Sequence, residues 1–172
     1  MATLRIHGSK PHTYKKFPLQ KKIPRPSGRG FFICINPSTA TPEKPDPAMR
    51  KIKAISGING YDSCIMLNVY SQRATNPNNL AGTCNPTMHK KNIEVIKGIV
   101  KDGATVVAAW GDLIGKRNYL IDCLKEIVKE LNGIKIKWKH LGNFTKNDNP
   151  RYPLFLPTNV ALNDFDIKGY IK

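Results

Sequence analysis

Residues 31–40 read FFICINPSTA, and this stretch decides the fold. Its first half is a short apolar run of strand length, which predicts a buried β-strand. The run stops abruptly at Asn36-Pro37, so a polar loop begins directly at the carboxyl end of the strand. Two later apolar runs, at 64–67 and 105–109, repeat this arrangement and end in Asn68 and Trp110.

Helical patterns alternate with these strand patterns. Asp46-Pro47 is a typical N-cap and first-turn pair, and it predicts a helix that ends near Gly57–Gly60. Asn85-Pro86 predicts a second helix, which closes before Gly103. A third apolar stripe with helical spacing runs from Leu113 to Leu131.

The last strand pattern, Ile134 to Leu141, alternates lysine with apolar residues. This half-exposed pattern predicts an edge strand. The order β-α-β-α-β-α-β predicts an α/β fold, a three-layer α/β/α arrangement around a four-stranded parallel sheet. In such sheets, ligands bind outside the carboxyl ends of the strands, so we expect the site on the loops that follow them.

The charge is large and unevenly distributed. The 172-residue chain carries 28 basic and 12 acidic residues, for a net charge of +16. Residues 1–30 contain basic but no acidic residues, so we predict a basic N-terminal arm over 1–30 and one α/β domain over 31–172. Such charge favours a polyanionic partner, with nucleic acid first and an anionic membrane second.

Several classes are disfavoured. The four cysteines show no C-x-x-C spacing, which argues against a zinc site or a disulfide framework. No apolar run has membrane-spanning length, and no signal peptide is evident. Neither a dinucleotide fingerprint nor a phosphate-binding P-loop is present. We therefore expect a cytoplasmic protein, monomeric, without metal, cofactor or membrane partner.

Several motifs occur in a recognisable order: residues 35–40 (INPSTA), Asp46-Pro47, residues 73–75 (RAT), residues 109–111 (AWG) and residues 149–154 (NPRYPL). Over residues 30–157 the chain resembles a bacterial and phage family of unknown function marked by an L-N-P-S-T-A signature. That family usually has histidine where Tyr152 stands.

The layout also resembles, more distantly, the uracil-DNA glycosylase superfamily. This resemblance implies a four-stranded parallel sheet, a water-positioning role for Asn36 and a base-reading role for Asn68. It also implies that residues 142–153 form a final loop that acts on DNA. That loop lacks the H-P-S motif often found in the superfamily, so Tyr152 or Arg151 would stand in for it.

The residue types suit cleavage of an N-glycosidic bond. An asparagine can orient the attacking water, and its carboxamide can pair with a base edge. Asp46 is a candidate general base if the Pro-rich loop folds back. The candidate stacking rings for a flipped base are Phe32, Tyr70 and Trp110. The candidate DNA contacts are Ser38, Arg73, Lys146 and Arg151.

Each candidate also has a structural interpretation. Asn36 and Asn68 could be turn residues at strand ends, and Asp46 could be only a helix cap. The remaining structural alternatives are a core role for Trp110, a bridging role for Arg73 and simple packing for Tyr152.

The leading functional hypothesis is a monofunctional DNA glycosylase, a hydrolase that flips out and excises a damaged or modified pyrimidine. The long loops after the first two strands could accommodate a bulky base, and the family context suggests defence against phages with modified DNA. Two alternatives stay open. One is a non-catalytic nucleic-acid-binding module of the same fold, and the other is an N-glycosidase that acts on free nucleosides or nucleotides.

Overall fold

The computed structural model describes residues 28–37, 41 and 44–172. Nearly all of the predicted basic arm therefore lies outside the described residues. Strands and helices alternate through most of the chain, in the order β1 (Arg29–Cys34), α1 (Pro47–Ile58), β2 (Ser63–Asn68), α2 (Pro86–Ile99), β3 (Thr105–Ala108), α3 (Asn118–Glu130), β4 (Lys137–Leu141), β5 (Leu162–Asp164) and α4 (Ile167–Tyr170). The described 3-10 helices are η1 (Pro77–Asn79), η2 (Gly111–Lys116) and η3 (Pro153–Phe155).

The strands form one mixed sheet with the order β2-β1-β3-β4-β5. Strands β1 to β4 run parallel, as predicted, but β5 adds a fifth strand antiparallel to β4. The prediction that β4 is an edge strand is therefore wrong. Of its lysines, Lys139 forms an ion pair of 2.6 Å with Asp164 on β5, whereas Lys137 is exposed.

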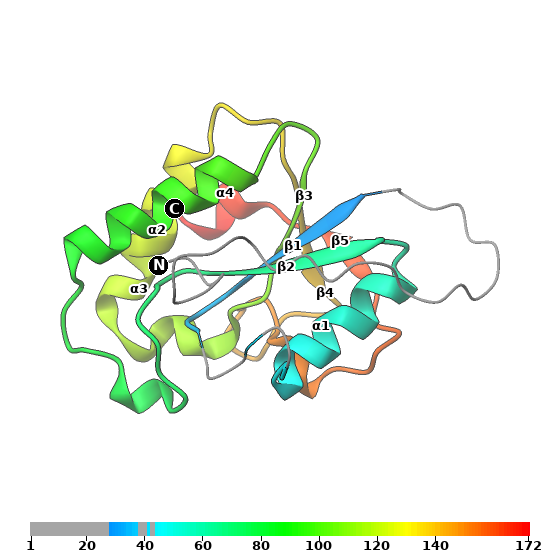
Figure 1. Cartoon of the computed structure of the whole chain (residues 1–172), viewed down its shortest axis with the longest axis horizontal. Coiled ribbons are helices and arrows are strands. Elements are labelled where there is room, and N and C mark those ends of the chain that lie inside the picture. Colours follow the sequence, from blue (N-terminus) through cyan, green and yellow to red (C-terminus); the bar gives the residue numbers. More distant parts are fainter. Residues whose placement is uncertain (1–27, 38–40, 42–43) are drawn as a thin grey trace.

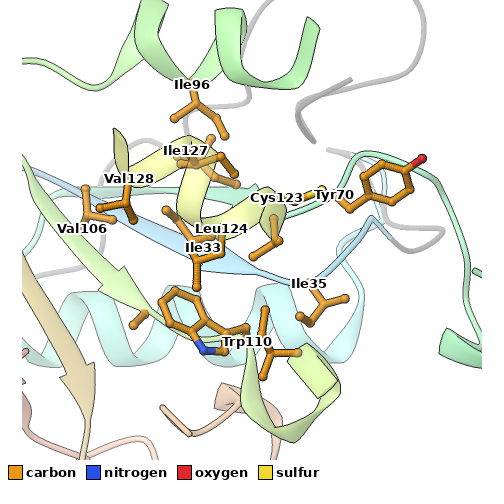
Figure 2. Packing of buried hydrophobic residues seen from close by; sticks show 14 of the residues in the cluster. Ile33, Ile35, Tyr70, Ile96, Val106, Trp110, Cys123, Leu124, Ile127 and Val128 are labelled. Carbon is orange, nitrogen blue, oxygen red and sulfur yellow. The ribbon is translucent and has the colours of Figure 1, made fainter. Parts of the chain in front are cut away.

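Helices cover both faces of the sheet, with α1 on one side and α2 and α3 on the other (Figure 1). The alternation of side chains along β1 explains this arrangement. Phe32 and Cys34 pack towards α1, whereas Ile33 and Ile35 pack towards α2 and α3. Figure 2 shows the second of these cores, where Leu124 and Ile127 of α3 lie over Ile33.

The predicted helix starts at Asp46 and Asn85 are confirmed. The side chain of Asp46 accepts a hydrogen bond from the Met49 amide at 2.7 Å, and Asn85 caps α2 in the same way. The third helix differs from the prediction, because residues 111–116 form a 3-10 helix and α3 begins only at Asn118.

Arg117 separates these two helices. Its backbone is extended, with φ −138° and ψ 135°. Its guanidinium donates to the carbonyl oxygens of Asn78 and Leu80, each at 2.8 Å. The break therefore coincides with a side chain that fastens the connection before α2 to the start of α3.

Candidate active site

The segments that follow β1, β2, β3 and β4 are joined by backbone hydrogen bonds. The Val69 amide donates to Cys34 at 2.8 Å, and the Ala109 amide donates to Ile33 at 2.9 Å. One step further out, the Gly111 amide donates to the Pro150 carbonyl at 2.8 Å. The carboxyl edge of the parallel strands thus brings together the loops that the sequence singled out.

Asn36 connects two of these loops. Its side chain is half-buried, and Nδ2 donates to the carbonyl oxygens of Ala74 at 2.6 Å and Pro37 at 3.0 Å. The Ala74 bond spans 38 residues of sequence, so it fixes the loop after β1 to the loop after β2. This geometry supports a turn-stabilising role for the Asn36 carboxamide, whose nitrogen holds the two loops together.

Asn68 is the last residue of β2 and lies opposite Cys34 of β1. Its side chain is fully buried. The Asn92 side chain of α2 donates to the backbone carbonyls of Asn68 and Val69, at 3.0 and 3.3 Å. Helix α2 therefore helps to hold the end of β2 in place, and the predicted base reader lies beneath the surface.

Asp46 is the N-cap of α1 and is half-buried. Burial raises the pKa of Cys34 and of Tyr152, and Asp46 lies close enough to both for its charge to raise them further. The cap interpretation is confirmed. The structure also places this carboxylate in the same neighbourhood as Tyr152, which sequence spacing could not show.

Tyr152 is half-buried and lies directly over Gly111. Burial raises the pKa of its phenol, and Cys34 and Asp46 raise it further, so the hydroxyl remains protonated at neutral pH. A protonated hydroxyl can donate a hydrogen bond. Gly111 adopts a φ of +62°, and a Cβ at this position would lie 3.1 Å from the Tyr152 Cβ.

The final loop is held by a polar network. Asp112 accepts hydrogen bonds from Thr145 at 2.6 Å and Asn149 at 2.8 Å. Asn149 in turn accepts from the Tyr170 hydroxyl at 2.6 Å, and that hydroxyl accepts from the Trp110 indole at 3.1 Å. These bonds tie the loop after β4 to the end of β3 and to α4, and so fix the approach of the chain to Tyr152.

The three predicted stacking rings are buried. Phe32, Tyr70 and Trp110 expose at most 1% of their surface. Phe32 packs in the core beneath α1, and the other two pack in the core beneath α2 and α3. Their burial favours the packing interpretation, because none of them presents a face to solvent.

The described candidates for DNA contact lie on two different loops. Arg73 is exposed and lines a cavity of about 390 Å³ together with Lys91 and Ser71. Arg151 and Lys146 are exposed on the final loop, where the Arg151 Nε donates to the Phe144 carbonyl at 3.3 Å. Ser38 lies outside the described residues.

Phe155 was missed by the sequence reasoning. Its side chain is 83% exposed, and its ring lies 6.3 Å from that of Tyr152. It belongs to η3, which starts at Pro153. The available signal in the sequence was an aromatic residue between Pro153 and Pro157, close after Tyr152. Only the structure shows that this ring is exposed beside the candidate site.

Among the described residues, no group of three or more His, Cys, Asp or Glu side chains could hold a metal ion. Within the same part of the chain, no helix is both long and apolar enough to cross a membrane.

Comparison with models of protein families gives a match over most of the chain. The family model described as a protein of unknown function (DUF1643) matches residues 16–154. No curated protein and no solved structure matches the chain. Since the matched residues make up most of its length, the chain belongs to the DUF1643 family of proteins of unknown function.

Proposed function

We propose that this protein is a DNA glycosylase that hydrolyses the N-glycosidic bond of a damaged or modified pyrimidine. The observation that carries the proposal is that Asp46 and Tyr152 both lie near Cys34, the last residue of β1, and Asn36 follows Cys34 by two residues. The net charge of +16 supports a polyanionic substrate.

The proposed reaction needs an oriented water molecule, a group that stabilises positive charge on the sugar, and a hydrogen-bond donor for the departing base. Water attacks C1′ while the bond to the base nitrogen breaks and its electron pair leaves with the base. The Asn36 side chain would orient the water, and the Asp46 side chain would stabilise the sugar cation and take the proton. The Tyr152 hydroxyl, which stays protonated, would donate to the leaving base or to a phosphate.

Base reading by Asn68 places a further demand on the protein. Because this side chain is fully buried, the neighbouring loops would have to open when nucleic acid binds. The exposed Phe155 ring beside Tyr152 is a candidate for the apolar contact that fills the space left by a flipped base.

The burial of Asn68 and of the three rings favours a second candidate, a nucleic-acid-binding module without catalysis. Both candidates predict salt-dependent binding, but only the glycosylase releases a base. The first experiment is therefore detection of free base by mass spectrometry and of abasic sites by alkaline cleavage. The substrates are duplex and single-stranded oligonucleotides containing uracil, mismatches or modified cytosines, with free nucleosides alongside.

The variants sharpen this test. Asp46→Asn and Asn36→Ala should each reduce base release at least tenfold. Arg73→Ala should weaken binding, whereas Lys135→Ala, which removes an equal charge before β4 at the opposite edge of the sheet, should not. If no oligonucleotide releases a base but binding is retained, the glycosylase hypothesis fails and the protein acts as a nucleic-acid-binding module. Release from nucleosides alone would instead indicate an enzyme acting on small substrates.

A further inference from the structure

Two cysteines that are far apart in the sequence meet in the fold. Cys84 precedes the N-cap of α2, and Cys123 lies on α3, 39 residues later. Their sulfur atoms are 3.7 Å apart. A disulfide bond is about 2.0 Å long, so the sulfurs would need to approach by only about 1.7 Å. We propose that Cys84 and Cys123 form an oxidation site, in which a hydroperoxide converts the two thiols into a reversible disulfide.

The two thiols differ in access. Cys84 is partly exposed and lines two cavities, of about 620 and 830 Å³. Cys123 is 2% exposed and belongs to the core beneath α2 and α3. A small oxidant therefore reaches Cys84 first, and Cys123 is the thiol that resolves the oxidised sulfur.

The segment that carries Cys84 is already fixed against α3. Besides the bonds from Arg117, the Tyr119 hydroxyl of α3 donates to the Ala81 carbonyl at 3.1 Å. On the other side of Cys84, the Asn85 amide donates to the Tyr70 hydroxyl at 2.8 Å. These contacts hold the segment that carries Cys84 against α3, where Cys123 lies.

The surroundings favour neutral groups. Burial and the adjacent Cys84 raise the pKa of the Cys123 thiol, so this thiol is protonated at neutral pH. Burial raises the pKa of Tyr70 and brings that of Tyr119 to about 12, so both phenols stay uncharged. Figure 2 shows Cys123 next to Tyr70 at the margin of this core.

The chemistry balances without a metal or cofactor. The Cys84 sulfur attacks one oxygen of hydrogen peroxide, the O–O bond breaks, and a sulfenic acid and water form. The Cys123 sulfur then attacks the Cys84 sulfur and displaces the hydroxyl group, which leaves as a second water with the Cys123 proton. Two thiols are oxidised by two electrons, and one peroxide is reduced to two waters.

The other two cysteines provide an internal control. Cys34 and Cys64 are buried, at 2% and 0% exposure, in the core on the opposite face of the sheet. On the paired strands Cys64 lies opposite Gly30, four residues before Cys34. At about 3.3 Å per residue, this offset separates them by roughly 13 Å, well beyond disulfide reach.

The test uses the full chain treated with stoichiometric hydrogen peroxide, blocked with N-ethylmaleimide and analysed by mass spectrometry. We expect the mass of the monomer to fall by two hydrogen atoms. A crosslinked peptide pair containing Cys84 and Cys123 should appear, and dithiothreitol should reverse the change fully. The oxidised protein should also unfold at a higher temperature, because the crosslink restricts the unfolded chain.

Two variants separate the roles of the thiols. Cys123→Ala should leave a sulfenic acid on Cys84 that dimedone traps, whereas Cys64→Ala should form the disulfide at the wild-type rate. Peptide mapping of the oxidised wild-type protein tests the proposal even if a variant does not fold. The proposal is overturned if Cys84 proceeds to sulfinic acid without crosslinking, if the disulfide joins two chains, or if Cys34 or Cys64 is oxidised as fast as Cys84.

Discussion

The bridge made by Asn36 allows a quantitative test of how the candidate site is held together. Its Nδ2 donates to Ala74 at 2.6 Å and to Pro37 at 3.0 Å, and only the first bond joins distant parts of the chain. We consider two substitutions. Asn36→Ala removes both bonds, whereas Asn36→Asp keeps the shape and replaces the donor with an acceptor.

The magnitude follows from these bonds. A typical intramolecular hydrogen bond contributes about 0.5–1.5 kcal/mol net, and the Pro37 bond between neighbours restrains little. We therefore expect Asn36→Ala to lower the free energy of unfolding by about 1–2 kcal/mol. For a chain of this size, that loss corresponds to a decrease in Tm of roughly 2–8 °C.

At neutral pH, Asn36→Asp should lower the free energy of unfolding by roughly 3 kcal/mol relative to the wild type, because a carboxylate oxygen would face carbonyl oxygens. This environment raises the pKa of the introduced carboxyl in the folded state above its unfolded value of about 3.9. Below that value both states are protonated, and the carboxyl O–H can donate to Ala74. As the pH rises through about 4, the unfolded state releases its proton first, so stability is lost.

The assay is urea unfolding of both variants from pH 3.5 to 7.5, with Asn132→Asp as the control. Asn132 is exposed, so the same substitution there should change stability little. The reasoning fails if Asn36→Asp is as stable as the wild type at pH 7. It also fails if its deficit relative to the wild type does not shrink towards pH 4.

Three further predictions use the same unfolding assay. Gly111→Ala should cost about 1–3 kcal/mol because of the positive φ and the contact with Tyr152, whereas Gly115→Ala, with nothing within 4 Å of the added Cβ, should be neutral or slightly stabilising. Gly115→Ala is therefore the control for Gly111→Ala. Hydrogen bonds hold the pKa of Asp112 below its usual value, so its contribution exists above the unfolded pKa and is lost as the pH falls through the folded pKa. Asp112→Asn should therefore cost about 0.5–1 kcal/mol at pH 7, reduced by solvent screening, and a deficit that persists in acid would contradict this assignment. Ile127→Ala should cost about 2–5 kcal/mol, because the side chain is fully buried, and a loss below 1 kcal/mol would show that the core collapses around the gap.

The sequence by itself determined the alternation of strands and helices and the starts of α1 and α2. Local signals suffice for these features. An apolar run of strand length predicts a buried strand, and an Asp-Pro or Asn-Pro pair satisfies the first amides of a helix. The parallel direction of the first four strands followed from the helices between them, because a crossover returns the chain to the same end of the sheet.

Contacts between distant residues were decided only by the tertiary structure. The alternating lysines of β4 predicted an edge strand, but β5 pairs with β4 and places Asp164 beside Lys139. Leu113 has helical spacing with α3, yet Arg117 leaves the helix to bind carbonyls nearly 40 residues earlier. Neither effect has a local signature, because the energy comes from groups that approach only after the chain has folded.

The same distinction holds for the candidate site. Residue types at strand ends predicted that Asn36 and Asn68 lie at the carboxyl edge of the sheet, and Asp46 was predicted from its place before Pro47 as a helix cap. The structure decided how far each is buried, that Tyr152 packs on Gly111, and that Cys84 meets Cys123. Burial and side-chain proximity depend on how the layers pack, and no periodicity along one chain encodes the distance between two of its elements.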